Sequence, residues 1–147
     1  MRRAVVVVLL ASLAPGCATT RIGGSAAALI EEAVFSAGDR QYQLDACSSG
    51  DLQQFLGVDL VDRKTGASVR LVMDPLDGPR LRVAFRETGP RQGLVLGPAQ
   101  CSRLEAAAGP TGWEVNTVRD VSGFVDAECT SGEGETIRVH VRFSHCH

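Results

Sequence analysis

The segment FLGVDLVDRKTGASVRLVMDPLDGPRLRVAFRE, residues 55–87, decides the fold of this 147-residue chain. Apolar and polar residues alternate with period two in three runs of it, as in β-strands with one buried face. The runs are Phe55–Asp62, Ala67–Asp74 and Arg80–Glu87. A four-residue loop ending in Gly66 suits a hairpin, and the turn at 75–79 is rich in proline and glycine. The segment predicts a three-stranded antiparallel meander.

Pairing Asp62 with Ala67 sets the register of the first two strands. One face of the pair is then wholly apolar, and on the other face Asp59 lies opposite Arg70, a favourable cross-strand pair. A slip of one residue would destroy both features. The apolar pairs are Val58 with Leu71, Leu56 with Met73 and Leu60 with Val69, and the third strand adds Leu81, Val83 and Phe85.

Later segments predict more short strands. Tyr42, Leu44 and Ala46 mark one strand, and the others are Trp113–Val118, Val121–Cys129 and Glu135–Phe143. The last two form a hairpin around residues 130–134, and Trp113 is expected in the core. Many short strands with Gly and Pro turns predict an all-β fold, a mostly antiparallel sandwich or a small barrel.

One short helix is expected within this β-rich domain, over Pro98–Ala108. Pro98 begins the segment, alanines fill it, and Gly109 and Pro110 end it. A second short helix over Ala26–Ala33, capped by Ser25, is compatible with the sequence.

The chain begins MRRAVVVVLLASLAPGC, residues 1–17. Two arginines precede an apolar run, Ala4–Ala14, that is far shorter than the ~20 residues a membrane-spanning helix needs. This arrangement predicts a cleaved export signal. The residues Leu13-Ala14-Pro15-Gly16-Cys17 resemble the lipobox of bacterial lipoproteins, in which the cysteine is lipidated and becomes the first residue of the mature protein.

The resemblance to bacterial lipoproteins implies a domain organisation and a location. Residues 1–16 are the signal peptide, 17–29 carry the lipid on Cys17 and form a flexible tether, and 30–147 are a single domain. Ala18 after the cysteine, where an aspartate would retain the protein at the inner membrane, implies the outer membrane, with the domain facing the periplasm or the cell surface. More than one acyl chain is needed for stable anchoring.

Four cysteines remain after Cys17, an even number that predicts two disulfides in an exported protein. If the hairpin pairs Cys129 near residue 135, Cys129 and Cys146 lie at opposite ends of a ladder some 30 Å long, too far apart to bond. Cys47–Cys146 with Cys101–Cys129 is therefore favoured over Cys47–Cys129 with Cys101–Cys146.

The polar face of the meander carries arginines whose guanidinium groups suit phosphate or carboxylate ligands. These candidates for an anion or partner surface are Arg70, Arg80, Arg82 and Arg86. A solvated sheet face is the alternative interpretation. The chain is mildly acidic, with net charge −2 and few aromatics, which argues against nucleic-acid binding.

Catalytic and metal motifs are weak in this sequence. There is no Gly-x-Ser-x-Gly, His-Glu-x-x-His or P-loop pattern, so we expect no catalytic residues and no cofactor. His145 and His147 would share a face if the last strand continued, but a third metal ligand is not evident.

The sequence therefore predicts an outer-membrane lipoprotein with a non-catalytic binding or assembly domain. Its partners would be the membrane, through the lipid, and a protein of a cell-envelope machine for secretion, motility or adhesion. An inhibitor of lysozyme-type hydrolases is the alternative, since such lipoproteins are similar in size, anchor and β-content. A small envelope enzyme or a metal-binding protein is a weaker alternative.

Overall fold

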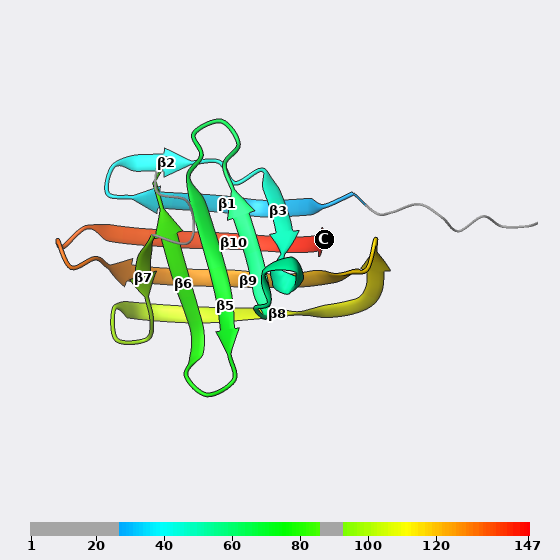
Figure 1. Cartoon of the computed structure of the whole chain (residues 1–147). Coiled ribbons are helices and arrows are strands. Elements are labelled where there is room, and N and C mark those ends of the chain that lie inside the picture. Colours follow the sequence, from blue (N-terminus) through cyan, green and yellow to red (C-terminus); the bar gives the residue numbers. More distant parts are fainter. Residues whose placement is uncertain (1–26, 86–92) are drawn as a thin grey trace, which may run out of the picture.

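The computed structural model describes residues 27–85 and 93–147, which form two antiparallel five-stranded sheets (Figure 1). In spatial order, the back sheet contains β2 (Arg40–Tyr42), β1 (Leu29–Ala37), β10 (Thr136–Cys146), β9 (Val118–Thr130) and β8 (Cys101–Val115). The front sheet contains β3 (Ala46–Ser49), β4 (Gly57–Val61), β5 (Ser68–Asp74), β6 (Gly78–Ala84) and β7 (Leu94–Leu96). A 3-10 turn, η1 (Gly50–Gln53), joins β3 to β4.

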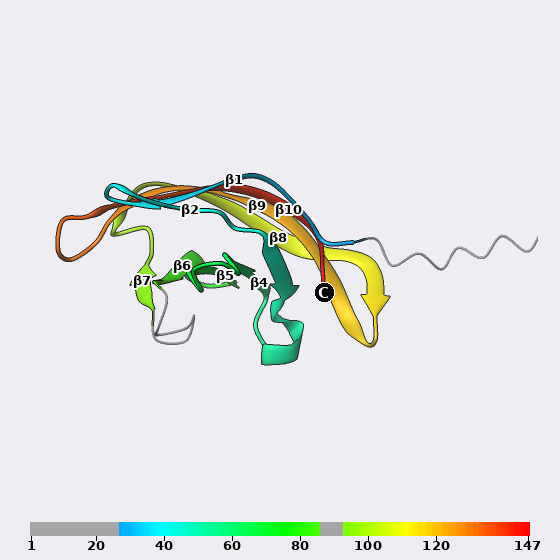
Figure 2. The same cartoon turned by 90° about the horizontal axis from the view of Figure 1, so that it is seen from above.

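The two sheets pack face to face with their strands crossed (Figures 1 and 2). Between them lie the apolar side chains that the period-two pattern assigns to the interior, from both sheets. The expected all-β, antiparallel sandwich is thus confirmed. Within the described residues, no helix is long and apolar enough to cross a bilayer.

The predicted register of the meander is confirmed. Val58 pairs with Leu71, Asp59 pairs with Arg70, and the N–H of Asp62 donates to the carbonyl of Ala67 over 2.9 Å. The inner residues of β4, β5 and β6 are essentially inaccessible to solvent. They are Val58, Leu60, Val69, Leu71, Leu81 and Val83.

The C-terminal hairpin is also confirmed. β9 and β10 pair from Thr130 with Thr136 onward, and their alternate residues, such as Val125 and Val141, face the core. A bulge after Phe143 shifts the register, so that Cys146 pairs with Val121. Cys129 and Cys146 therefore lie near opposite ends of the ladder, as expected.

Two disulfides brace the sandwich, in the pairing that the strand geometry favoured. Cys47–Cys146 links β3 of the front sheet to β10 of the back sheet, and Cys101–Cys129 links the neighbouring strands β8 and β9. The first closes a loop of 99 residues, and the second one of 28. The longer link ties the two layers together at one corner.

The predicted helix over Pro98–Ala108 is wrong. Residues 98–100 form a turn, and β8 begins at Cys101 and pairs with β9 along its length. Alanine favours helices only weakly, and the sheet pairing overrides that preference. Every second residue of this stretch packs against the core, namely Leu104, Ala106 and Ala108. The run of alanines hides this period-two pattern in the sequence.

Three further expectations need correction. The helix considered over Ala26–Ala33 is wrong, because β1 begins at Leu29, whereas Ala26 lies outside the described residues. The strand expected over residues 42–46 is two strands, since the chain crosses between sheets at the buried Leu44. Trp113 is not in the core: it is 65% exposed near the end of β8.

Candidate functional site

Arg70 does not belong to an exposed arginine surface, so that prediction is wrong at this residue. Its Nε lies 2.6 Å from Oδ1 of Asp59 and its Nη2 lies 2.7 Å from Oδ2, a two-pronged ion pair. The guanidinium also donates to Gln53 and lies 4.5 Å above the ring of Phe55. The side chains of Arg70 and Asp59 are only 10% and 6% exposed.

The other predicted arginines have different surroundings from Arg70 where the structure describes them. Arg80 is exposed and bonds to Asp77 within the same hairpin. Arg82 is half-buried and pairs with Arg70 across β5 and β6. Arg86 lies outside the described residues. The sequence predicted which face of the strands carries these arginines, but it did not predict that Gln53 and Phe55 cover Arg70.

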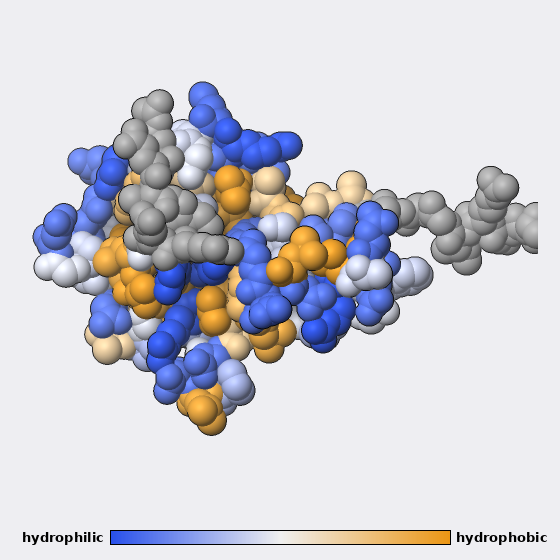
Figure 3. Space-filling view, in the orientation of Figure 1, coloured by the Kyte–Doolittle hydropathy of each residue, from blue (hydrophilic) through white to orange (hydrophobic). Residues whose placement is uncertain are grey.

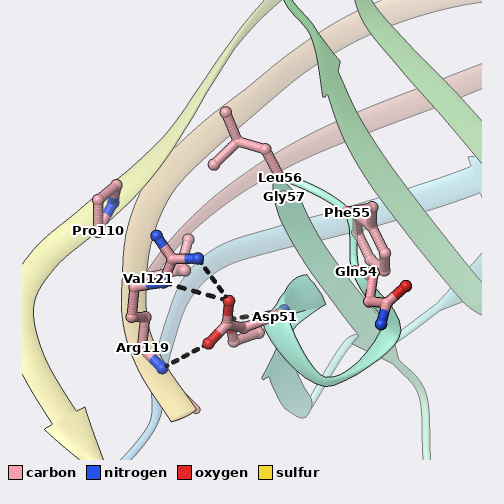
Figure 4. A pocket seen from close by; sticks show the side chains of 9 residues that line it. Asp51, Gln54, Phe55, Leu56, Gly57, Pro110, Arg119 and Val121 are labelled. Carbon is pink, nitrogen blue, oxygen red and sulfur yellow. Dashed lines mark hydrogen bonds and ion pairs between the residues drawn. The ribbon is translucent and has the colours of Figure 1, made fainter.

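A cleft of about 490 Å³ opens between the sheets beside η1 (Figure 4). Residues of η1 and the start of β4 form one wall, and residues of β8 and β9 form the other. Leu56 and Pro110 lie on opposite sides of the opening (Figure 4). The lining residues are Ser49, Asp51, Gln54, Phe55, Leu56, Gly57, Pro110, Arg119 and Val121.

An ion pair between Asp51 and Arg119 joins the two walls (Figure 4). Nη2 of Arg119 lies 2.8 Å from Oδ1 of Asp51, its Nε lies 3.2 Å from the same oxygen, and its backbone N–H donates to Oδ2 over 3.2 Å. The side-chain and backbone hydrogen bonds from Arg119 hold the pKa of the Asp51 carboxyl below its usual value, against the effect of burial. The same carboxylate raises the pKa of Arg119.

Local packing explains why η1 sits where it does. Ser49 caps the turn by accepting a hydrogen bond from the N–H of Asp51. The ring of Phe55 folds back over Gly50, where an added Cβ would lie 2.6 Å from it. Gly57 has φ +148°, and a Cβ there would meet the carbonyl of Leu71 at 1.9 Å, so both glycines are required for the close approach.

Arg70, on β5, helps to hold the η1 wall of the cleft in place. Its contacts with Gln53 and Phe55 tie the C-terminal end of the η1 turn to the front sheet. Gln53 also donates to Oδ2 of Asp59 over 3.2 Å. The predicted anion ligand is therefore a positioning residue for the cleft.

The chemistry of the cleft suits binding. Its charged groups, Asp51 and Arg119, neutralise each other, and the hydroxyl of Ser49 is engaged in the cap. Phe55, Leu56, Pro110 and Val121 offer apolar surface. A cleft with apolar surface and one ion pair between its walls can hold a ligand side chain and fix its orientation.

His145 and His147 do not form the paired ligands that a continuing strand would give. The bulge after Phe143 gives His145 a φ of +56°, and its Nδ1 lies 3.1 Å from Oδ2 of the buried Asp120. Nδ1 of His147 lies 2.9 Å from the carbonyl of His145. Throughout 27–85 and 93–147, no cluster of three or more His, Cys, Asp or Glu side chains is placed to hold a metal ion.

Comparisons with known proteins do not identify this chain. No protein-family model matches it, and neither do curated proteins or solved structures. Its functional interpretation therefore depends on the geometry of its own residues.

Replacing Arg70 by alanine will lower the free energy of unfolding by about 3–5 kcal/mol, because Asp59 is left as an uncompensated buried charge. Arg80→Ala is the matched control: its ion pair is exposed, and its loss should cost less than about 1 kcal/mol. Urea denaturation of both purified proteins measures the difference. Equal effects of the two substitutions would show that Arg70 is not structural.

Acid will remove the contribution of Asp51 to stability. Because the folded pKa of Asp51 is lowered, this contribution is fully present above the unfolded value of about 3.9 and disappears as the pH falls through the folded value. The stability difference between the native protein and Asp51→Asn should therefore narrow as the pH is lowered from 7 toward 2. Denaturation at a series of pH values tests this, and a constant difference would contradict it. Arg119→Gln should show the same convergence.

Proposed function

We propose that this chain is a lipid-anchored, non-catalytic binding module of the bacterial outer membrane. The observation that supports a lipid anchor is the pairing of the other cysteines. Cys47, Cys101, Cys129 and Cys146 bond to one another, so the cysteine of the lipobox-like sequence is the one left outside the two disulfides. Cys17 itself lies outside the described residues.

Disulfides also favour an exported protein, since they persist in oxidising compartments such as the periplasm. A domain of this kind, tethered by about a dozen residues after Cys17, would stay close to the membrane surface while its faces remain accessible to envelope proteins. The proposed partner is a protein component of an envelope assembly.

The cleft is the proposed binding site on the domain. Leu56 at its mouth is 51% exposed, and Leu52 on the adjoining η1 turn is 75% exposed. Exposed leucines beside a cleft are typical of protein-interaction sites when they adjoin buried apolar surface. Figure 3 shows apolar side chains gathered in patches among polar ones on the front-sheet face.

The anchor is tested by replacing Cys17 with serine. The variant should appear in the soluble fraction of fractionated cells, because it lacks the acyl chains that hold the protein on the membrane. Its thermal unfolding should be unchanged, since the two disulfides and the core remain. A Cys17→Ser protein that stays with the membrane after a high-salt wash would overturn the anchor.

The binding role is tested with a photo-crosslinking amino acid at position 56 in the full-length, lipidated protein in its own membrane. Position 34 is a matched control, because Val34 is 52% exposed, compared with 51% for Leu56, and lies on β1 of the back sheet. We expect one envelope protein, identified by mass spectrometry, to be crosslinked from position 56 and not from 34. The same adducts from both positions, or none from 56, would contradict a binding role for the cleft.

A further inference from the structure

β8 ends the back sheet with a long free edge. It pairs with β9 on one side, and in the described part of the chain no strand lies along its other side (Figure 1). The pairing is regular from Arg103 to Pro110. Alternate backbone N–H and C=O groups along such an edge point outward and are available to another strand.

The other sheet edges offer much less. β2 and β7 have three residues each and β3 has four, whereas β8 has 15. Proteins usually protect edges by shortness, lysine, proline or a bulge. β8 contains no lysine, and its proline, Pro110, stands at the end of the regular stretch.

The front sheet extends past this edge. In Figure 1 the β5–β6 hairpin crosses β8 and continues beyond it. The N–H of Met73 donates a hydrogen bond to the carbonyl of Leu56 over 2.8 Å, and Met73 pairs with Pro79 on β6. These three residues therefore form one apolar row across the front sheet, on its inner side. We call this row, Leu56, Met73 and Pro79, the ledge. None of its members is fully buried.

The ledge lies where a further strand of the back sheet would be. The next row inward, Val58, Leu71 and Leu81, is fully buried between the sheets, and β8 packs against β4, β5 and β6. The ledge lies two residues, or about 6.6 Å, farther along the front-sheet strands than this buried row. That distance is comparable with the spacing of about 4.8 Å between neighbouring strands of the back sheet. Because the sheets cross, a strand added beside β8 would face the ledge with its inward side chains.

We propose that β8 binds an extended segment of the partner protein as an added strand, with the segment's alternate apolar side chains packed on the ledge. This inference rests on the proposed function and names how the partner binds. The segment continues toward the cleft, since Pro110 of β8 and Leu56 of the ledge both line the cleft. Backbone hydrogen bonds supply the affinity, and the ledge selects apolar residues at every second position.

The charged side chains of β8 indicate which residues the bound segment should carry on its solvent-facing side. Arg103 and Glu105 point outward and are exposed, and Arg103 already pairs with Asp126 of β9 over 2.9 Å. A basic residue of the segment beside Glu105 would complete a favourable cross-strand pair. The fitting ligand is therefore an amphipathic strand, apolar toward the ledge and polar with a basic residue toward solvent.

A second copy of this chain does not fit the same place. The inward side chains of its β8, including Leu104 and Ala106, are already packed against the core of that copy. They could not also contact the ledge of the other copy. The edge requires a strand whose inward face is free before binding.

The test uses full-length lipidated protein in detergent and a displayed library of eight-residue linear peptides with Val, Ile or Leu at alternate positions. Enriched peptides should slow amide hydrogen exchange in β8 between residues 103 and 109. Methylating the peptide's backbone nitrogens on its pairing edge should weaken binding at least about tenfold, because the donors are lost.

Variants of the ledge provide the controls. Met73→Glu should weaken peptide binding at least about tenfold by placing a charge against the apolar row, whereas Met73→Leu should retain it. Leu76→Glu changes the 93%-exposed hairpin tip outside the ledge and should leave binding within about twofold. Circular dichroism confirms that each variant is folded.

Several outcomes would overturn strand addition. They are no enrichment over a library with the alternation shuffled, exchange protection away from β8, binding that survives Met73→Glu, and a dimer that Met73→Glu dissociates. If Met73→Glu leaves the adduct from position 56 intact, strand addition fails while the binding role stands. If no partner is captured at all but the peptides bind as described, the binding role fails instead.

Discussion

The buried ion pair between Asp59 and Arg70 is the constraint on which the rest of the front sheet depends. Removing two charges from water is costly, and the cost is offset here by a two-pronged contact, a further bond to Gln53 and the face of Phe55. A two-residue slip between β4 and β5 would keep the apolar residues on the core face but would separate Asp59 from Arg70 and leave each buried charge without its partner. The pair therefore enforces a single register in a sheet whose apolar side chains alone would distinguish registers less sharply.

The Asp59–Arg70 pair also positions one wall of the cleft, although neither residue lines it. A single 3-10 turn has few backbone hydrogen bonds, so the position of η1 depends on what its side chains contact. Gln53 and Phe55 attach it to Arg70, and Asp51 then reaches Arg119 on the other sheet. Together with Cys47–Cys146, this gives two links between the sheets near one end of the sandwich, one covalent and one ionic.

The sequence was sufficient for those elements whose local pattern and pairing agree. The meander and the β9–β10 hairpin alternate cleanly, and their registers satisfy both apolar and charged partners, so they were predictable. β8 was not, because its alanines favour a helix and hide its alternation, although β9, its partner strand, follows directly after residues 116–117. The burial of Arg70 also escaped prediction, since alternation assigns a face but does not show what covers it. The cleft joins Asp51 to Arg119 across 68 residues, through sheet packing that local patterns do not encode.

The size difference between the two sheets explains why one edge differs from the others. The strands of the front sheet cross those of the back sheet, so their length sets how many back-sheet strands they can cover. β5 and β6 are long enough to continue beyond β8, which leaves Leu56, Met73 and Pro79 with apolar surface but no opposing strand. Partly exposed apolar surface thus lies beside a strand with free backbone groups. Exposed apolar surface is costly in water, whereas the edge N–H and C=O groups are hydrated and open to pairing, and one amphipathic strand would cover the first and pair with the second.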